Sequence, residues 1–80
     1  MKVLIEYTHK DGTQFRLCDR GTIFNVQMKA ADAIDWGTVR AWSQRVKVAH
    51  IVYFHKLIKT LSHTKIKALR RNINSHFVVK

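Results

Sequence analysis

Three cations and one amide recur at helical spacing near the C-terminal end of the chain, at positions i, i+3, i+4 and i+7. They are Lys67, Arg70, Arg71 and Asn74, with Lys65 close by. Arginine can pair with guanine through two hydrogen bonds, asparagine pairs with adenine in the same way, and lysine contacts phosphate. This spacing therefore predicts a helix face that contacts nucleic acid. The alternative interpretation is a solvated basic face on a surface helix.

A second set of cations alternates with apolar residues along the segment 38–61. The cations are Arg40, Arg45, Lys47, Lys56 and Lys59, and the apolar residues among them are Val48, Ile51, Val52 and Ile58. Basic side chains beside apolar ones suit an interface, where cations reach phosphates or carboxylates while aliphatic surface is buried. The same pattern would suit the seam of a homodimer, or simple packing between a sheet and a second helix.

The charges are divided between the two halves of the chain. All five acidic residues precede Trp36, whereas ten of the 15 Lys and Arg residues follow Asp35, so the formal net charge of +10 belongs to the second half. A long stretch of one sign cannot be neutralised by its own side chains and favours an anionic partner. Nucleic-acid phosphate is the commonest such partner.

Other chemistries find little support in the sequence. The five histidines lack metal-ligand spacing, no cofactor motif is present, and we expect neither a metal nor catalytic residues. A metal-independent ribonuclease that uses histidine and cations alone is the minor enzymatic alternative. The single Cys18 excludes an internal disulfide and suits a reducing cytoplasm. The apolar run 51–54 is far too short to span a membrane, and no signal peptide is evident.

The pattern of residues predicts one small α+β domain over residues 1–80. Alternating apolar positions indicate strands over 2–8, 14–18 and 22–28, joined by turns at Asp11-Gly12 and at Gly21. We expect this three-stranded antiparallel meander to be followed by a basic helical region over 38–77. That region would hold a long helix over 38–61, capped by Asp35 or Thr38, and a shorter helix over 64–77.

The sequence allows more than one interpretation of the helical region and makes specific predictions about which of its residues are buried. The segment 46–54 is β-branched enough to form a fourth strand instead of a helix. An apolar stripe at helical spacing is expected to form the buried side of the long helix; it comprises Val39, Trp42, Val46, Ala49, Tyr53, Leu57 and Leu61. His50 is expected to be buried. Trp36 is expected either to close the rim of the core or to offer a ring on which a base can stack.

The segment HKLIKTLSHTKIKALRRN, residues 55–72, resembles a helix–turn–helix, with a short polar turn between two helices. It lacks the small residue and the glycine that are usual in such a turn. The leading hypothesis is a non-enzymatic regulator that binds DNA or RNA through its basic helices. The alternative is a small inhibitor or adaptor, of the kind that phages and mobile elements encode, which docks on an acidic or nucleic-acid-binding protein surface.

Overall fold

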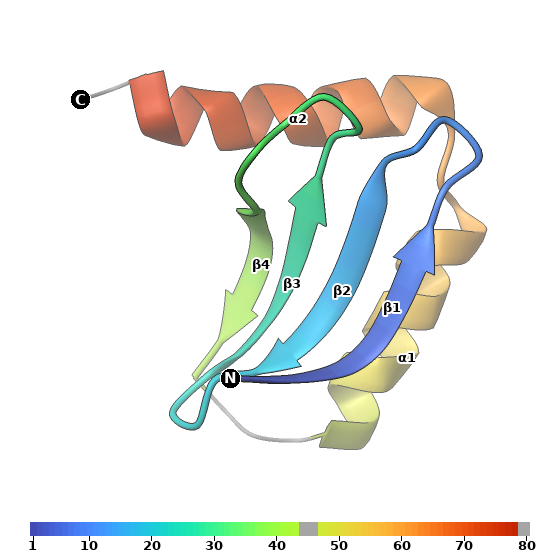
Figure 1. The fold of residues 1–80 in the computed structure, drawn as a ribbon. Helices are drawn as coiled ribbons and strands as arrows, with labels where there is room; N and C mark the ends of the chain where they lie inside the picture. The colour runs from blue at the N-terminus through green and yellow to red at the C-terminus, as the bar shows by residue number, and fades with distance from the viewer. Residues whose placement is uncertain (44–46, 79–80) are drawn as a thin grey trace.

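The computed structural model describes residues 1–43 and 47–78, with side chains for 1–43 and 47–71. The elements, in chain order, are β1 (Lys2–Thr8), β2 (Gln14–Asp19), β3 (Phe24–Lys29), β4 (Gly37–Trp42), α1 (Lys47–Lys59) and α2 (His63–Val78). Neighbouring strands pair antiparallel in the order β1-β2-β3-β4. Both helices lie on one side of this sheet, and α2 crosses near one end of the strands (Figure 1). The class is α+β, as predicted.

The first hairpin closes through a three-residue loop. The backbone N–H of His9 donates to Thr13 O at 2.8 Å, and that of Gly12 donates to His9 O at 2.9 Å. Gly12 has a φ of 93°, which L side chains rarely adopt. Asp11 Oδ1 accepts the Thr13 N–H at 2.9 Å, and this hydrogen bond holds the pKa of Asp11 below its usual value. The predicted hairpin is therefore confirmed.

The second hairpin is tighter, because only Gly21 and Thr22 separate the paired residues. The Arg20 N–H donates to Ile23 O at 2.9 Å, and Gly21 takes a φ of 90° at the first central position, as a type II′ turn requires. Since the turn uses Thr22 and Ile23 closes it, β3 begins at Phe24, two residues later than predicted.

The predicted long helix over 38–61, with its cap at Asp35 or Thr38, is wrong. Residues 37–42 form a fourth strand, and α1 begins only at Lys47. The pairing of β3 with β4 shifts between Val26 and Gln27, which leaves one extra residue in β4. Because of this bulge, Val39 and Trp42 both pack against the core although they are three residues apart. That spacing mimics a helix.

The interpretation of 46–54 as a strand is also wrong, because α1 covers residues 47–59. Ala49, expected on the buried side of the helix, is exposed. His50 and Phe54 occupy that side instead, at 4% and 0% exposure. The buried side was misassigned because the apolar stripe was counted in helical steps of 100° from Val39, which lies on a strand. By the start of α1, this count is about one residue out of phase with the true helix.

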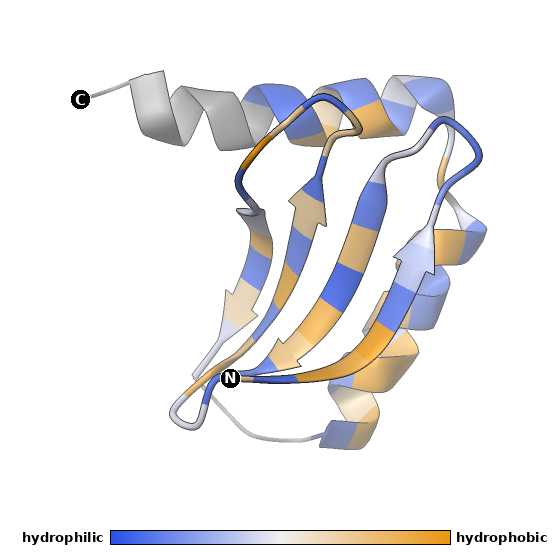
Figure 2. Cartoon of the chain, viewed as in Figure 1, coloured by the Kyte–Doolittle hydropathy of each residue, from blue (hydrophilic) through white to orange (hydrophobic). Residues whose placement is uncertain are grey.

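One hydrophobic core lies between the sheet and the helices. Its buried members are Phe15, Leu17, Val26, Met28, Phe54, Leu57 and Ile66. Along the strands, hydrophobic and hydrophilic residues alternate (Figure 2), which directs one face of β2 and β3 to this core. At the start of α2, Ser62 Oγ accepts the Lys65 N–H at 3.2 Å, so Ser62 caps the N-terminal end of this helix. No helix in the described part of the chain is long and apolar enough to cross a membrane.

Candidate nucleic-acid interface

The two helices meet at a short connection that is surrounded by lysines; we call this region the helix junction. It comprises Thr60, Leu61 and Ser62, together with Lys56, Lys59, Lys65 and Lys67 on the flanking turns. The Thr60 hydroxyl donates to Lys56 O at 3.0 Å and to Leu57 O at 3.1 Å, and the Thr60 N–H donates to the same two carbonyls at 3.2 Å, so Thr60 closes the last turn of α1.

Lys65 closes the helix junction from the other side. Its Nζ donates to Thr60 Oγ1 at 2.7 Å, which places a positive charge beside the C-terminal end of α1. Cations are favoured there, because the last carbonyls of a helix carry partial negative charge. Lys65 therefore joins the two helices and still keeps two N–H donors for another group.

The remaining lysines of the helix junction point to solvent. Lys56, Lys59 and Lys67 are exposed, and none of them forms an ion pair with another described residue. Neither helix carries an acidic residue in its first turn. The N-terminal end of α2, where partial positive charge gathers, thus lies among cations and without a carboxylate of its own helix.

The predicted face of α2 is only partly assembled. Lys67 and Arg71 are exposed and one turn apart. Arg70 lies toward the sheet, where its Nη2 is 3.7 Å from Asp32 Oδ1 in the β3–β4 connection. Since the two side chains are 46% and 83% exposed, this pair stabilises the fold by less than about 1 kcal/mol. The side chain of Asn74 lies outside the described residues.

The other predicted cations do not join the helix junction. Arg40 lies on β4, with its Cζ 5.6 Å from the ring centre of Trp42 and 5.3 Å from that of Tyr53. Its assignment to the long helix was wrong. Lys47 begins α1, about 18 Å along the helix from Lys59. Arg45 lies outside the described residues. Six of the ten candidate side chains therefore lie at the helix junction and on α2, whereas Arg40 and Lys47 lie apart from them.

The opposite face of the sheet carries Arg16 and Gln27, as the alternation along the strands predicts, but sequence reasoning missed that Trp36 lies against Arg16. Arg16 Nε donates to Gln27 Oε1 at 2.6 Å, and the Arg16 guanidinium lies 3.9 Å from the ring centre of Trp36. Trp36 thus covers the face away from the helices and does not close the rim of the core. Arg16 and Gln27 are direct partners in the register of β2 and β3. The alternation of each with core residues is the sequence signal that places both on the face away from the core.

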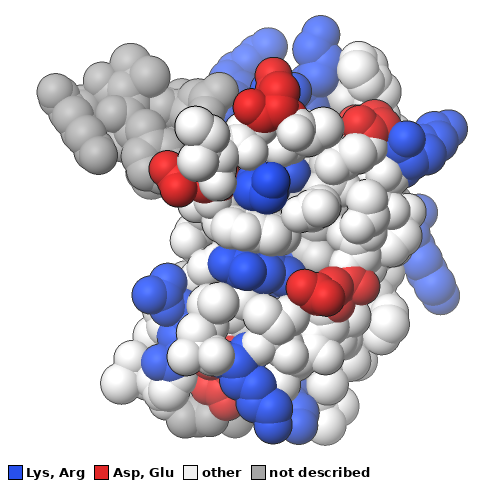
Figure 3. All heavy atoms as spheres, viewed as in Figure 1, with Lys and Arg blue, Asp and Glu red and all other residues white. Residues whose placement is uncertain are grey.

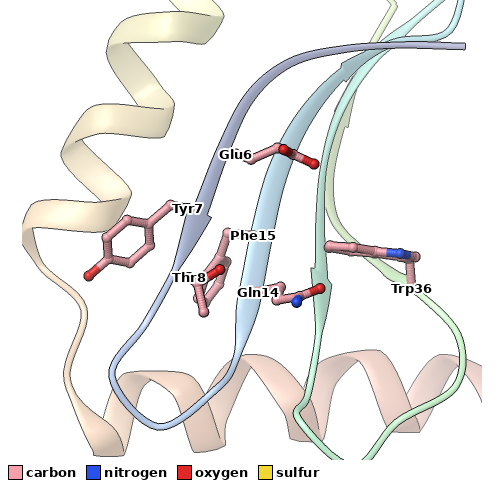
Figure 4. A pocket seen from close by; sticks show the side chains of 6 residues that line it. All are labelled: Glu6, Tyr7, Thr8, Gln14, Phe15 and Trp36. Atoms are coloured by element: carbon pink, nitrogen blue, oxygen red, sulfur yellow. The ribbon is translucent and has the colours of Figure 1, made fainter.

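A hollow of about 130 Å³ lies beside the Trp36 ring on this face (Figure 4). Its lining residues are Glu6, Tyr7, Thr8, Gln14, Phe15 and Trp36. Figure 3 shows acidic and basic side chains interspersed over the same face. The mixture of signs makes this face a poor counterpart for a polyanion, in contrast to the helices.

The remaining candidate groups serve the packing of the domain. His50 is buried and stacks on Trp42, with ring centres 4.4 Å apart, which fits the expectation of a buried histidine. Cys18 is fully buried, and this burial raises the pKa of its thiol, so the reactive thiolate is disfavoured. Among the described residues, no three His, Cys, Asp or Glu side chains are placed to hold a metal ion.

Comparisons of the chain with protein-family models, with curated proteins and with solved structures find no match. The chemistry of the residues and their arrangement therefore supply the whole argument about function.

Proposed function

We propose that the protein is a non-enzymatic nucleic-acid-binding regulator that contacts phosphates through its two helices. One observation carries the proposal: α1 and α2 contain seven Lys and Arg residues and no carboxylate. Every acidic residue of the chain precedes α1 in the sequence. The helices thus carry charge of one sign that no residue of their own can neutralise, on the side of the molecule away from the mixed sheet face.

The distribution of exposure supports phosphate as the target. A lysine that is exposed and has no neighbouring carboxylate can neutralise a phosphate without first breaking an ion pair. Lys56, Lys59 and Lys67 meet this condition. Each phosphate contact would release condensed counterions, so the affinity should depend steeply on salt concentration.

Any preference for sequence would come from α2. Arg70, Arg71 and Asn74 carry the groups that can read base edges, whereas the lysines of the helix junction position the protein on the backbone. The Asp32 carboxylate competes with a base for Arg70. This arrangement favours general phosphate binding with modest discrimination.

The proposal is tested by fluorescence anisotropy with labelled duplex DNA, single-stranded DNA and structured RNA, each at two salt concentrations. We expect submicromolar binding to at least one class, with an affinity that falls by several decades between low and moderate salt. Binding that is weak for all three classes at low salt would overturn the proposal, because the cations would then serve a different surface.

A further inference from the structure

Two valines on α1 face solvent. Val48 is 73% exposed and Val52, one helical turn later, is 46% exposed. The other apolar residues of the same mixed segment, Ile51 and Ile58, pack against the core. Packing within the domain therefore explains why the isoleucines are apolar, but it does not explain why the two exposed positions are valine.

Two lysines lie on the same side of the helix as the two valines. Lys56 and Lys59 follow Val48 and Val52 at i, i+4, i+8 and i+11, and both lysines are exposed. We call these four residues the α1 stripe. It is about 17 Å long, with an apolar part near the start of α1 and a basic part near its end.

We propose that the α1 stripe docks an acidic amphipathic helix of a protein partner. Exposed valines gain nothing from a phosphate backbone, but they lose contact with water when an apolar side chain covers them. The lysines can bury their aliphatic stems beside that contact and pair with carboxylates at its edge. A partner helix with an apolar stripe flanked by Asp or Glu meets both requirements.

Charge complementarity distinguishes this partner from the other occupants of such a face. A second copy would bring its own Lys56 and Lys59 against the same stripe, and α1 offers no carboxylate to offset that repulsion. A lipid surface would accept the lysines, but two valines give too little apolar area for stable insertion. The inference goes beyond the proposed function, because the valines take no part in phosphate binding.

The probe for the test is a synthetic amphipathic peptide of about 18 residues, long enough for a few helical turns, with leucines one turn apart and flanking glutamates. A matched peptide carries lysine in place of each glutamate. Binding is measured by anisotropy, and the contact is mapped by amide chemical shifts of the labelled protein. We expect the acidic peptide to bind and the lysine peptide not to bind, with the largest changes in amide chemical shift at the α1 stripe.

The test variant combines Val48→Thr and Val52→Thr, which keep the shape of both side chains and replace one methyl group of each by a hydroxyl. The control is Ala49→Ser, which changes an exposed residue of the same helix that lies outside the α1 stripe. We expect the double variant to lose about tenfold in affinity for the acidic peptide, and the control to keep it. Circular dichroism confirms that each variant is folded.

Three outcomes would overturn the inference. The first is an affinity for the acidic peptide that is unchanged in the double variant, which would reduce the contact to attraction between charges. The second is a dimer in sedimentation experiments that the valine changes dissociate, which would make the occupant a second copy. The third is binding to anionic vesicles that depends on both valines. If the unchanged protein fails to bind nucleic acid in a separate assay, that result overturns the proposed function and not the docking of the acidic helix.

Discussion

The sheet and the helices differ in whether their charged side chains have partners within the protein. On the sheet, carboxylates have local tasks: Asp11 and Asp19 accept backbone N–H groups in the two turns, and Asp32 reaches Arg70. On the helices, the lysines of the helix junction form no ion pair with a described carboxylate. The difference fits a sheet half organised for stability and the proposed role of the helical half, which is to present charge to a partner.

The two halves nevertheless share one core. Phe15 and Val26 from the sheet pack with Phe54 and Ile66 from the helices, all nearly inaccessible to solvent. The helical half therefore depends on the sheet for its shape, since its own polar surface supplies little stabilisation. Changes at the shared core should therefore affect both halves, whereas changes at the surface should affect the half that carries them.

The largest effect is expected from Phe54→Ala. Phe54 is fully buried between the helices and the sheet, so its truncation should lower the free energy of unfolding by about 3–5 kcal/mol. Chemical denaturation gives this value, and Val52→Ala, two residues away at an exposed position, is the control that should change stability little. A loss below about 1 kcal/mol for Phe54→Ala would contradict the packing of α1 on the sheet.

A smaller effect is expected at the hairpin turns, where Gly12→Ala and Gly21→Ala form a matched pair. Both glycines have a positive φ near 90°, so each substitution should cost about 1–2 kcal/mol of stability from backbone strain. A Cβ on Gly12 would also lie 2.8 Å from Ala31 Cβ, while one on Gly21 meets nothing within 4 Å. We expect Gly12→Ala to destabilise the protein more in thermal unfolding; equal losses would refute the close approach of the first turn to the β3–β4 connection.

The smallest effect is expected from Asp32→Asn, because Asp32 is a carboxylate of the sheet half that pairs with a helical cation, Arg70. The substitution frees Arg70 and removes a negative charge near α2, so affinity for nucleic acid should rise by about two- to threefold. Asp35→Asn, an equal charge change at an exposed position of the same connection, is the control. An equal gain in both variants would show that Arg70 does not contact the nucleic acid directly.

The sheet was largely predictable from sequence, because its signals are local. The Asp11-Gly12 and Gly21 turns each impose a backbone conformation, and the alternation along residues 14–18 assigns core and open faces directly. The fourth strand was not predictable in the same way. Its bulge converts the period of two into a spacing of three between Val39 and Trp42, which a single sequence cannot distinguish from a helix.

The candidate site was predictable in its charge but not in its arrangement. The excess of cations after Asp35 is a property of composition and survives any error in secondary structure. The contact of Lys65 with Thr60, and that of Arg70 with Asp32, depend on how the helices pack against the rest of the chain. For the same reason, Arg16 and Trp36 were not connected: they are 20 positions apart and meet only because the β3–β4 connection folds over the open face of the sheet.

The most direct test of the account compares two triple variants that remove equal charge. One removes Lys59, Lys67 and Arg71 from the helices, and the other removes Lys2, Lys10 and Arg20 from the sheet half, all six being exposed and replaced by alanine. The measurement is the slope of log affinity for nucleic acid against log salt concentration. We expect the helical variant to lose about one unit of slope per lost phosphate contact, and the sheet variant to keep the slope of the unchanged protein. Equal losses in the two variants would contradict the assignment of binding to the helices.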